Sequence, residues 1–291
     1  MSGGTHRLFF NSLGLRSGWR LLIYSILIYT LLAGKDLLVQ KTMGGLDDIS
    51  RYVIGHQLLR FAVCLLVSWV MSKIEGRTIA RYGLPMRSMF RGQFWQGAAV
   101  GLASLTLLLG VMWGLGIFSP GTIAPSIREG FGFGVLYGLI FIIISLSEEF
   151  CFRGYAQFTL SDGIGFWPAA VVLSSFFGYS HIGNSGETWL GALNAVLGGI
   201  LFCLLLQRSG NLWVPIGFHT GWNWGQTFFY GVPNSGQVVP GHLLDSSFSG
   251  PVWLTGGSVG PEGSWLATLL LVVLFLGINR WFRDVKYLQE I

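Results

Sequence analysis

Charge is scarce in this sequence, and the scarcity excludes an ordinary soluble domain. Only 11% of the 291 residues are charged, whereas 52% are hydrophobic. Soluble domains carry about 25% charged residues. We therefore expect an all-α, polytopic membrane protein in which residues 1–291 form a single integral membrane domain, with the lipid bilayer around it.

Cysteine is almost absent, so the sequence indicates neither a disulfide framework nor a cysteine zinc site. The three cysteines, Cys64, Cys151 and Cys203, lie inside apolar runs and share no paired spacing. We expect each to be a small, buried, apolar side chain. A repeat with a period of 20–50 residues and a heptad series are also missing, which argues against a repeat protein and a coiled coil.

Long apolar runs fill most of the chain and predict about eight transmembrane helices, at about 20 residues for each crossing. The runs are 19–38, 53–72, 94–118, 131–160, 166–182, 189–207, 212–231 and 264–282. The first run contains Leu32-Ala-Gly-Lys-Asp36, a poor cleavage context. We therefore expect an uncleaved first helix rather than a signal peptide.

The 18 basic residues predict no nucleic-acid partner, because they flank apolar runs and so indicate membrane orientation. With the N-terminus inside, twelve lie in cytoplasmic segments: Arg7, Arg16, Arg20, Lys73, Arg77, Arg81, Arg87, Arg91, Arg208, Arg280, Arg283 and Lys286. Four lie in outer segments (Lys35, Lys41, Arg51 and Arg128), and two, Arg60 and Arg153, lie within runs. This asymmetry predicts that both termini are cytoplasmic.

Four pairs of glycines at a spacing of four residues predict close helix approaches, because small residues let backbones come together in a membrane. The pairs are Gly97/Gly101, Gly110/Gly114, Gly134/Gly138 and Gly217/Gly221. With 43 glycines in the chain, several such pairs arise by chance. The spacing alone therefore does not say which pairs face a neighbouring helix.

Two acids and an arginine interrupt the run 131–160, within Ser145-Leu-Ser-Glu-Glu-Phe-Cys-Phe-Arg153. Each charge left alone at the centre of a membrane helix costs roughly 2.5–3.5 kcal/mol, so these side chains must face protein or water. Glu149 and Arg153 stand at i,i+4, where a carboxylate and a guanidinium can pair. Glu148 is left as the free carboxylate. The alternative is a structural ion pair with a spare acid.

Two histidines lie inside later runs. His181 ends Phe177-Gly-Tyr-Ser-His181, and His219 shares a helical face with Asn223 at i,i+4. At a rise of 1.5 Å per residue, Glu148 lies about 20 Å and His181 about 24 Å from the turn between their runs. His219 lies about 14 Å from its own turn, so it reaches their level only through a tilted helix or a recessed turn.

A carboxylate, two imidazoles and an amide at one depth fit hydrolysis by activated water. Glu148, removed from water and so holding a proton more tightly, accepts a proton from that water while His181 helps to hold it. His219 and Asn223 then donate hydrogen bonds to the oxyanion. A second version makes Glu148, His181 and His219 ligands of a zinc ion whose bound water attacks. No serine or cysteine is placed to favour a covalent nucleophile.

In these motifs the sequence resembles the CAAX prenyl protease and bacteriocin-processing family of intramembrane endopeptidases, known as CPBP or Abi. The family pattern is matched by Glu148-Glu149-Phe-Cys-Phe-Arg153, Phe177-Gly-Tyr-Ser-His181 and His219-Thr-Gly-Trp-Asn223. The resemblance covers residues 131–231, the motif-bearing catalytic core, and residues 256–263 are also similar to bacterial members. It implies an eight-helix fold with an intramembrane catalytic cavity, in which Glu148 and His181 activate water while Glu149 and Arg153 support them.

The resemblance also implies a setting and a substrate class: a bacterial cell membrane, and a membrane-embedded or lipidated peptide or protein. It leaves the need for zinc open. Two other functions fit the same residues. One is a bacteriocin-immunity or binding protein that needs no proteolysis, and the other is a proton-relaying transporter, which the lack of an inverted repeat disfavours. The complete set of motif residues favours the enzyme.

Overall fold

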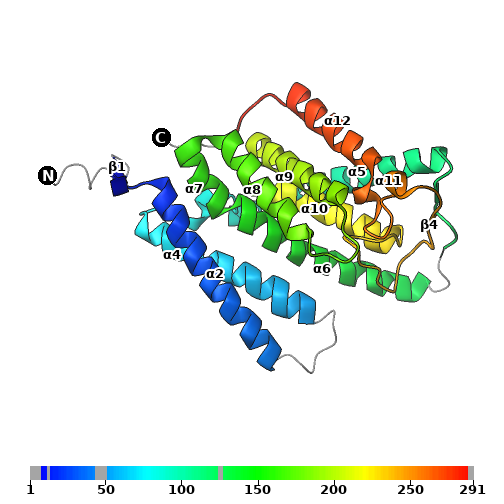
Figure 1. Ribbon diagram of the computed structural model, residues 1–291, viewed down its shortest axis with the longest axis horizontal. Coiled ribbons are helices and arrows are strands. Elements are labelled where there is room, and N and C mark those ends of the chain that lie inside the picture. The colour runs from blue at the N-terminus through cyan, green and yellow to red at the C-terminus, as the bar shows by residue number, and fades with distance from the viewer. Residues whose placement is uncertain (1–7, 12–13, 43–50, 124–126, 288–291) are drawn as a thin grey trace.

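Backbone N–H and C=O groups find no water in the hydrocarbon core of a bilayer, so apolar runs satisfy these groups internally by forming helices. The computed structural model, which describes residues 8–11, 14–42, 51–123 and 127–287, shows this outcome. Helices run through one bundle, and loops with two-residue strands join them (Figure 1). The expectation of a helical integral membrane protein is confirmed, and Arg7 lies outside the described residues.

Nine helices of ten or more residues make up the described bundle. They are α2 (Ser17–Thr42), α4 (Leu59–Ile74), α5 (Gly92–Gly114), α6 (Ile127–Arg153), α7 (Tyr155–Ile164), α8 (Phe166–His181), α9 (Trp189–Ser209), α10 (Trp213–Trp224) and α12 (Trp265–Trp281). The shorter ones are the π-helices η1 (Arg51–Leu58) and η4 (Gly225–Phe229), α11 (Val252–Thr255), and the 3₁₀ turns η2 (Ile79–Tyr82), η3 (Met86–Ser88) and η5 (Pro261–Gly263). Strands β1 (Phe10–Asn11) and β2 (Gly14–Leu15) pair antiparallel, as do β3 (Phe118–Ser119) and β4 (Ser247–Phe248).

Five helical segments in the described ranges are long and apolar enough to cross a membrane. They are Ser17–Thr42, Gly55–Ile74, Gly92–Gly114, Gly130–Ile164 and Trp189–Ser209. Helix α12 is apolar but shorter. Helices α8 and α10 have only 16 and 12 residues, below the roughly 20 that a full crossing needs. Length and composition thus support five crossings, and eight stays a prediction.

The run 131–160, predicted as one span, is divided at Gly154. Helix α6 ends at Arg153 and α7 begins at Tyr155. A Cβ atom at position 154 would stand 2.3 Å from the carbonyl oxygen of Phe150, so only glycine fits this change of direction. The path from Glu148 to the turn before α8 is therefore not one straight helix, and a depth estimate that assumes a constant rise fails there.

Helices α5 and α10 pack backbone against backbone through two of the predicted glycine pairs. A Cβ at Gly97 or Gly101 would stand 2.2 or 2.1 Å from a carbonyl oxygen of α10, and one at Gly217 or Gly221 would stand 2.0 or 2.1 Å from one of α5. We call this contact the glycine seam. The prediction was wrong for Gly110/Gly114, where an added Cβ would meet nothing within 4 Å. Spacing identifies small residues but not the face that meets another helix.

A disulfide joins Cys64 of α4 to Cys151 of α6, with their Cα atoms 5.8 Å apart. This corrects the expectation that all three cysteines are unpaired apolar side chains; Cys203 alone is free and buried. The two partners are 87 residues apart in sequence. Such a pair carries no local spacing signal, because only the packing of α4 on α6 brings it together.

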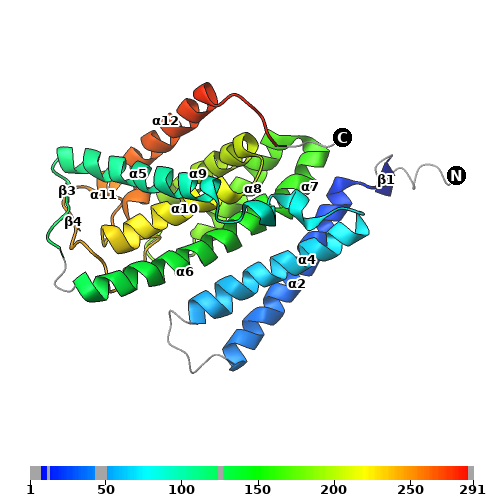
Figure 2. The ribbon, with the colours of Figure 1, turned by 180° about the vertical axis from the view of Figure 1, so that it is seen from behind.

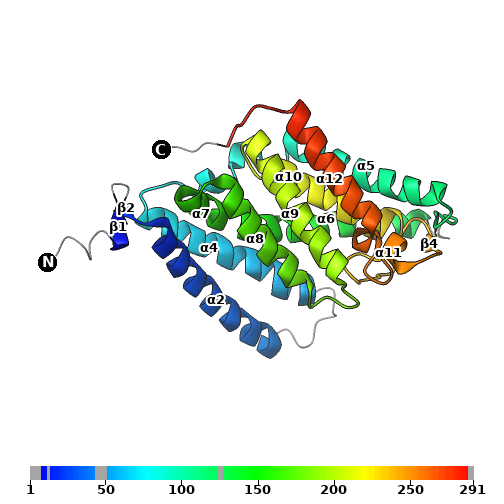
Figure 3. The ribbon, with the colours of Figure 1, turned by 45° about the horizontal axis from the view of Figure 1, so that its top comes forward.

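Helices α2 and α4 lie side by side at one edge of the bundle, and α12 lies at the opposite edge (Figures 1 and 2). Arg20, near the start of α2, forms ion pairs with Glu75 at 2.6 Å and with Asp162 of α7 at 3.0 Å. After α12 the chain returns to α7, where Tyr287 packs on Phe158 with ring centres 4.7 Å apart. The start of α2 and the last described residues therefore lie at one end of the bundle, away from β4 (Figure 3).

Candidate active site

Glu149 is fully buried, and it has partners on two helices. From α6 itself, Arg153 Nη1 donates to Glu149 Oε1 across 3.4 Å, so the predicted i,i+4 pair forms. From α10, His219 Nδ1 donates to the same oxygen across 3.0 Å. The second contact had no signal in the sequence. It places His219 at the level of the acidic pair and removes the apparent mismatch in depth.

Aromatic rings and a glycine surround the fully buried side chain of Arg153. Its guanidinium carbon lies 4.4 Å from the ring centre of Phe177 and 5.6 Å from that of Phe202, within the range of cation–π attraction. A Cβ at Gly199 would stand 2.4 Å from Nη2, so this position must stay small. The site thus holds a buried cation that is matched to Glu149, and removing either charge leaves the other uncompensated.

Glu148 is not the free carboxylate that helical spacing predicted. Arg60 of α4 donates from Nη2 to Glu148 Oε1 across 3.1 Å. The other oxygen, Oε2, lies 3.9 Å from His219 Nε2, too long for a direct hydrogen bond but within reach of one bridging water. Burial alone would make Glu148 hold a proton more tightly. Arg60 supplies a positive charge that stabilises the ionised carboxylate.

Arg60 is the site residue that sequence reasoning missed, although one signal was available. It is a single cation inside the run 53–72, and an intramembrane charge predicts a partner of opposite sign. Several acids were candidates for that partner. The choice of Glu148 depends on how α4 packs against α6, which spacing along one chain cannot supply.

His181, His219 and Asn223 line one cavity of about 100 Å³. A water needs about 10–15 Å³ of such volume, so the cavity has room for several. The ring of Phe177 lies beside both histidines, with centres 4.6 Å from His181 and 6.5 Å from His219. Glu148 is not among the lining residues and meets the cavity through His219.

Hydrogen bonds determine the tautomer of each histidine. His181 Nδ1 lies 2.7 Å from the carbonyl oxygen of Phe177, which only accepts, so Nδ1 carries the hydrogen. His219 Nδ1 in turn donates to the carboxylate of Glu149. In the neutral rings Nε2 is then an acceptor, and His219 donates through Nε2 only when it is protonated. The expected oxyanion role of His219 therefore requires the charged ring.

The candidate zinc ligands do not form a metal site. Among the residues that the structure describes, no three His, Cys, Asp or Glu side chains gather closely enough to hold a metal ion. The acidic oxygen beside His219 Nε2 is Glu148 Oε2, at 3.9 Å. The other oxygen of that carboxylate, Oε1, is paired with Arg60. The zinc version therefore stays a prediction, and the proposed reaction is written with Glu148 as the base.

The carboxyl group of Glu262, which the sequence assigned only to an outer loop, lines the same cavity. The backbone N–H of Ser235 donates to its Oε1 across 2.6 Å, and Gln226 Nε2 donates to its Oε2. Burial raises the pKa of Glu262 to about 8, although both hydrogen bonds oppose the shift. Burial also raises the pKa of Glu187, the other acid on the lining. A loop acid is ordinarily solvated, which is why sequence reasoning passed over Glu262.

Comparison with known proteins identifies the segment that carries these side chains. Residues 130–225 match the model of the family described as type II CAAX prenyl endopeptidase Rce1-like. The match includes Glu148, Glu149, Arg153, His181 and His219 with Asn223, and it leaves out α2, α4, α5 and the loop of Glu262. No curated protein matches the chain.

Proposed function

We propose that the chain, whose residues 130–225 match the Rce1-like family of type II CAAX prenyl endopeptidases, hydrolyses peptide bonds inside the membrane with water activated by Glu148. One observation carries the proposal. His219 lines a cavity together with His181 and Asn223, and its Nε2 stands 3.9 Å from Glu148 Oε2. One water can hydrogen-bond to both atoms at that separation.

The reaction uses Glu148 as a general base. The water oxygen attacks the carbonyl carbon of the scissile peptide bond while Glu148 Oε2 accepts a water proton. The C–O bond that forms turns the carbonyl into a tetrahedral oxyanion. When this intermediate collapses, the C–N bond breaks and the proton on Glu148 passes to the departing nitrogen. The products are a carboxylic acid and an amine, and Glu148 is again ionised.

Asn223 and His219 stabilise the oxyanion in this proposal. The Asn223 amide supplies N–H donors from the cavity wall, and one such donor is worth about 10²–10³-fold in rate. His219 contributes through Nε2 when its ring is protonated, and its Nδ1 is held by the Glu149 carboxylate at 3.0 Å. Arg153 balances the charge of Glu149. His181, whose Nε2 is an acceptor, helps to hold the attacking water.

The proposed substrate is a membrane-embedded or lipidated peptide or protein, because the cavity lies among helices that are apolar enough to cross a bilayer. The proposed setting is a bacterial cell membrane with both termini in the cytoplasm, supported by the twelve-to-four distribution of basic residues. Peptides and membrane proteins are the substrate chemistry that this family implies.

Glu148→Gln tests the proposal. The amide keeps nearly the same volume and still hydrogen-bonds, but it cannot accept the proton, so folding survives while hydrolysis falls by at least about 10²-fold. The measurement compares membrane-peptide profiles of cells that hold the intact protein with those that hold the variant. Asp245→Asn, a carboxylate-to-amide change at an exposed position, is the control and leaves the profile unchanged.

Treatment with a chelator separates water activation by Glu148 alone from activation by a zinc ion. With Glu148 as the base, incubation with a chelator leaves hydrolysis unchanged; a loss of activity that added zinc restores would require the metal version. The binding or immunity alternative is decided by the same variant. If Glu148→Gln protein at normal abundance keeps the protein's full cellular role, catalysis is rejected and binding stands.

A further inference from the structure

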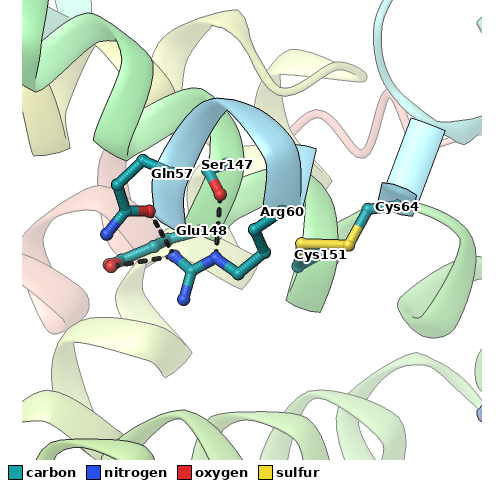
Figure 4. The surroundings of a disulfide bond; sticks show 6 residues. All are labelled: Gln57, Arg60, Cys64, Ser147, Glu148 and Cys151. Carbon is teal, nitrogen blue, oxygen red and sulfur yellow. Dashed lines mark hydrogen bonds and ion pairs between the residues drawn. A yellow bond between two sulfur atoms is a disulfide. The ribbon is translucent and has the colours of Figure 1, made fainter. Parts of the chain in front are cut away.

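Arg60 makes several hydrogen bonds at the contact between α4 and α6. Its Nε donates to Ser147 Oγ across 2.9 Å, and its Nη2 donates to Glu148 Oε1 across 3.1 Å and to Gln57 Oε1 across 2.8 Å (Figure 4). The guanidinium thus contacts the side chains of two consecutive residues on α6. Gln57 lies three residues before Arg60, is itself buried, and accepts a hydrogen bond from the guanidinium.

The disulfide stands one helical turn from this contact on both helices. Cys64 follows Arg60 by four residues on α4, and Cys151 follows Glu148 by three residues on α6. Residues at these spacings lie on the same helical face. The covalent bond between Cys64 and Cys151 therefore fixes the distance between α4 and α6 beside the pair of Arg60 and Glu148 (Figure 4).

The contact uses only one oxygen of the catalytic carboxylate. Arg60 holds Oε1, while Oε2 is directed to His219 Nε2 at 3.9 Å. The two side chains are 28% and 15% exposed, so the pair is partly shielded from water, where a charge-assisted hydrogen bond is stronger than at the surface. A carboxylate held at one oxygen cannot rotate freely, and its other oxygen stays aimed at the site of attack.

We infer that Arg60 is a positioning residue: it holds the Glu148 carboxylate oriented for proton abstraction, and the Cys64–Cys151 disulfide keeps Arg60 in place. Arg60 lies outside the residues that match the family model. The inference rests on the proposed role of Glu148 as general base. It assigns a part of the reaction to α4, a helix that otherwise serves only to pack against α2 and α6.

The test is a series at position 60 assayed on the full-length protein in detergent or liposomes. Arg60→Ala lowers kcat about 10–10²-fold with little change in KM, because a misdirected base costs rate and not substrate binding. Arg60→Lys retains the charge but cannot make the Nε and Nη2 contacts together, so its kcat lies between those of the other two proteins. Added guanidinium ion at millimolar concentration restores part of the kcat of Arg60→Ala and none of that of Glu148→Gln.

Arg20→Ala is the matched control, since Arg20 is also a buried arginine with carboxylate partners but stands away from the site. Its folded fraction keeps the normal kcat, and guanidinium changes nothing. An active Glu148→Gln protein would refute the proposed function itself. An inactive Glu148→Gln protein together with an unchanged kcat in folded Arg60→Ala, or with a loss that neither lysine nor guanidinium relieves, would refute the role of Arg60 alone.

Discussion

At the scale of single residues, the site depends on two ion pairs of different character. Glu149 and Arg153 are fully buried, whereas Glu148 and Arg60 are partly exposed. A fully buried charge that loses its partner keeps the whole desolvation cost. A partly exposed charge that loses its partner recovers some hydration, so the protein stays folded. Replacing the two arginines should therefore have different effects. Loss of Arg153 lowers the stability of the fold, and loss of Arg60 lowers the rate of hydrolysis.

Arg153→Ala is expected to lower protein abundance as well as activity. The change leaves Glu149 buried with only His219 to compensate it, at a penalty of about 3–5 kcal/mol for a broken buried pair. Quantitative immunoblotting of membranes and thermal unfolding in detergent measure the effect. Arg208→Ala removes a half-buried arginine whose contacts are hydrogen bonds to Asn279 and a carbonyl group, so it is the control. An abundant, fully active Arg153→Ala protein would contradict the ion pair.

Glu262 predicts a pH dependence of stability. Its pKa of about 8 in the folded protein exceeds the ordinary 4.5, so the folded state keeps a proton that the unfolded state has released. The free energy of unfolding therefore falls as pH rises from about 4.5 to 8, with a slope of up to about 1.4 kcal/mol per pH unit. Thermal unfolding at several pH values measures this slope. Glu262→Gln, which does not titrate, flattens it, and an equal slope in both proteins would contradict the shift.

At the scale of elements, the position of His219 follows from the glycine seam. His219 lies between Gly217 and Gly221 on α10. A Cβ atom added at either glycine would stand about 2 Å from a backbone carbonyl oxygen of α5. Glycine residues facing a neighbouring helix allow backbones this close. The depth at which α10 presents His219 to Glu149 is thus set on its opposite face, by α5.

Gly101→Val is expected to abolish activity and to lower stability. The added side chain would overlap the carbonyl oxygen of Phe218, from which a Cβ at 101 already stands only 2.1 Å, so α10 must move and take His219 with it. Gly110→Val is the matched control on the same helix, because a Cβ there meets nothing within 4 Å. Activity and detergent unfolding of the two variants are compared. Equal behaviour would show that the seam does not position α10.

At the scale of the whole molecule, the start of α2 and the last described residues both pack against α7 at one end of the bundle. The cavity lining includes residues of the loops before α9 and α12, toward the other end. The distribution of basic residues, twelve in cytoplasmic and four in outer segments, predicts that the first end faces the cytoplasm. The cavity is then predicted to lie nearer the outer face.

Reporter fusions test this orientation. Fusions at the C-terminus and in the loop between Lys73 and Arg91 are expected to report the cytoplasm, and a fusion in the loop between 232 and 263 is expected to report the outside. The reason is that basic residues concentrate in the first two segments, while the third has no Lys or Arg. A C-terminus on the outside, or a Lys73–Arg91 loop on the outside, would contradict the predicted topology of eight crossings with both ends inside.

The sequence by itself determined what depends on local spacing. Apolar runs determined the helices, because a bilayer leaves the backbone no other partner. The pair of Glu149 and Arg153, and the shared face of His219 and Asn223, followed from 3.6 residues per turn. These features involve residues within one turn of each other, so no packing angle enters.

Only the tertiary structure decided what joins distant segments. The contacts of Arg60 with Glu148 and of His219 with Glu149 span 88 and 70 residues, and the disulfide spans 87. Each needs a helix rotation and depth that one-dimensional spacing does not contain. The glycine pairs show the same limit, since four pairs share one spacing but only the seam residues face each other. The break at Gly154 also escaped prediction, because a glycine inside an apolar run is compatible with a straight helix until packing bends it.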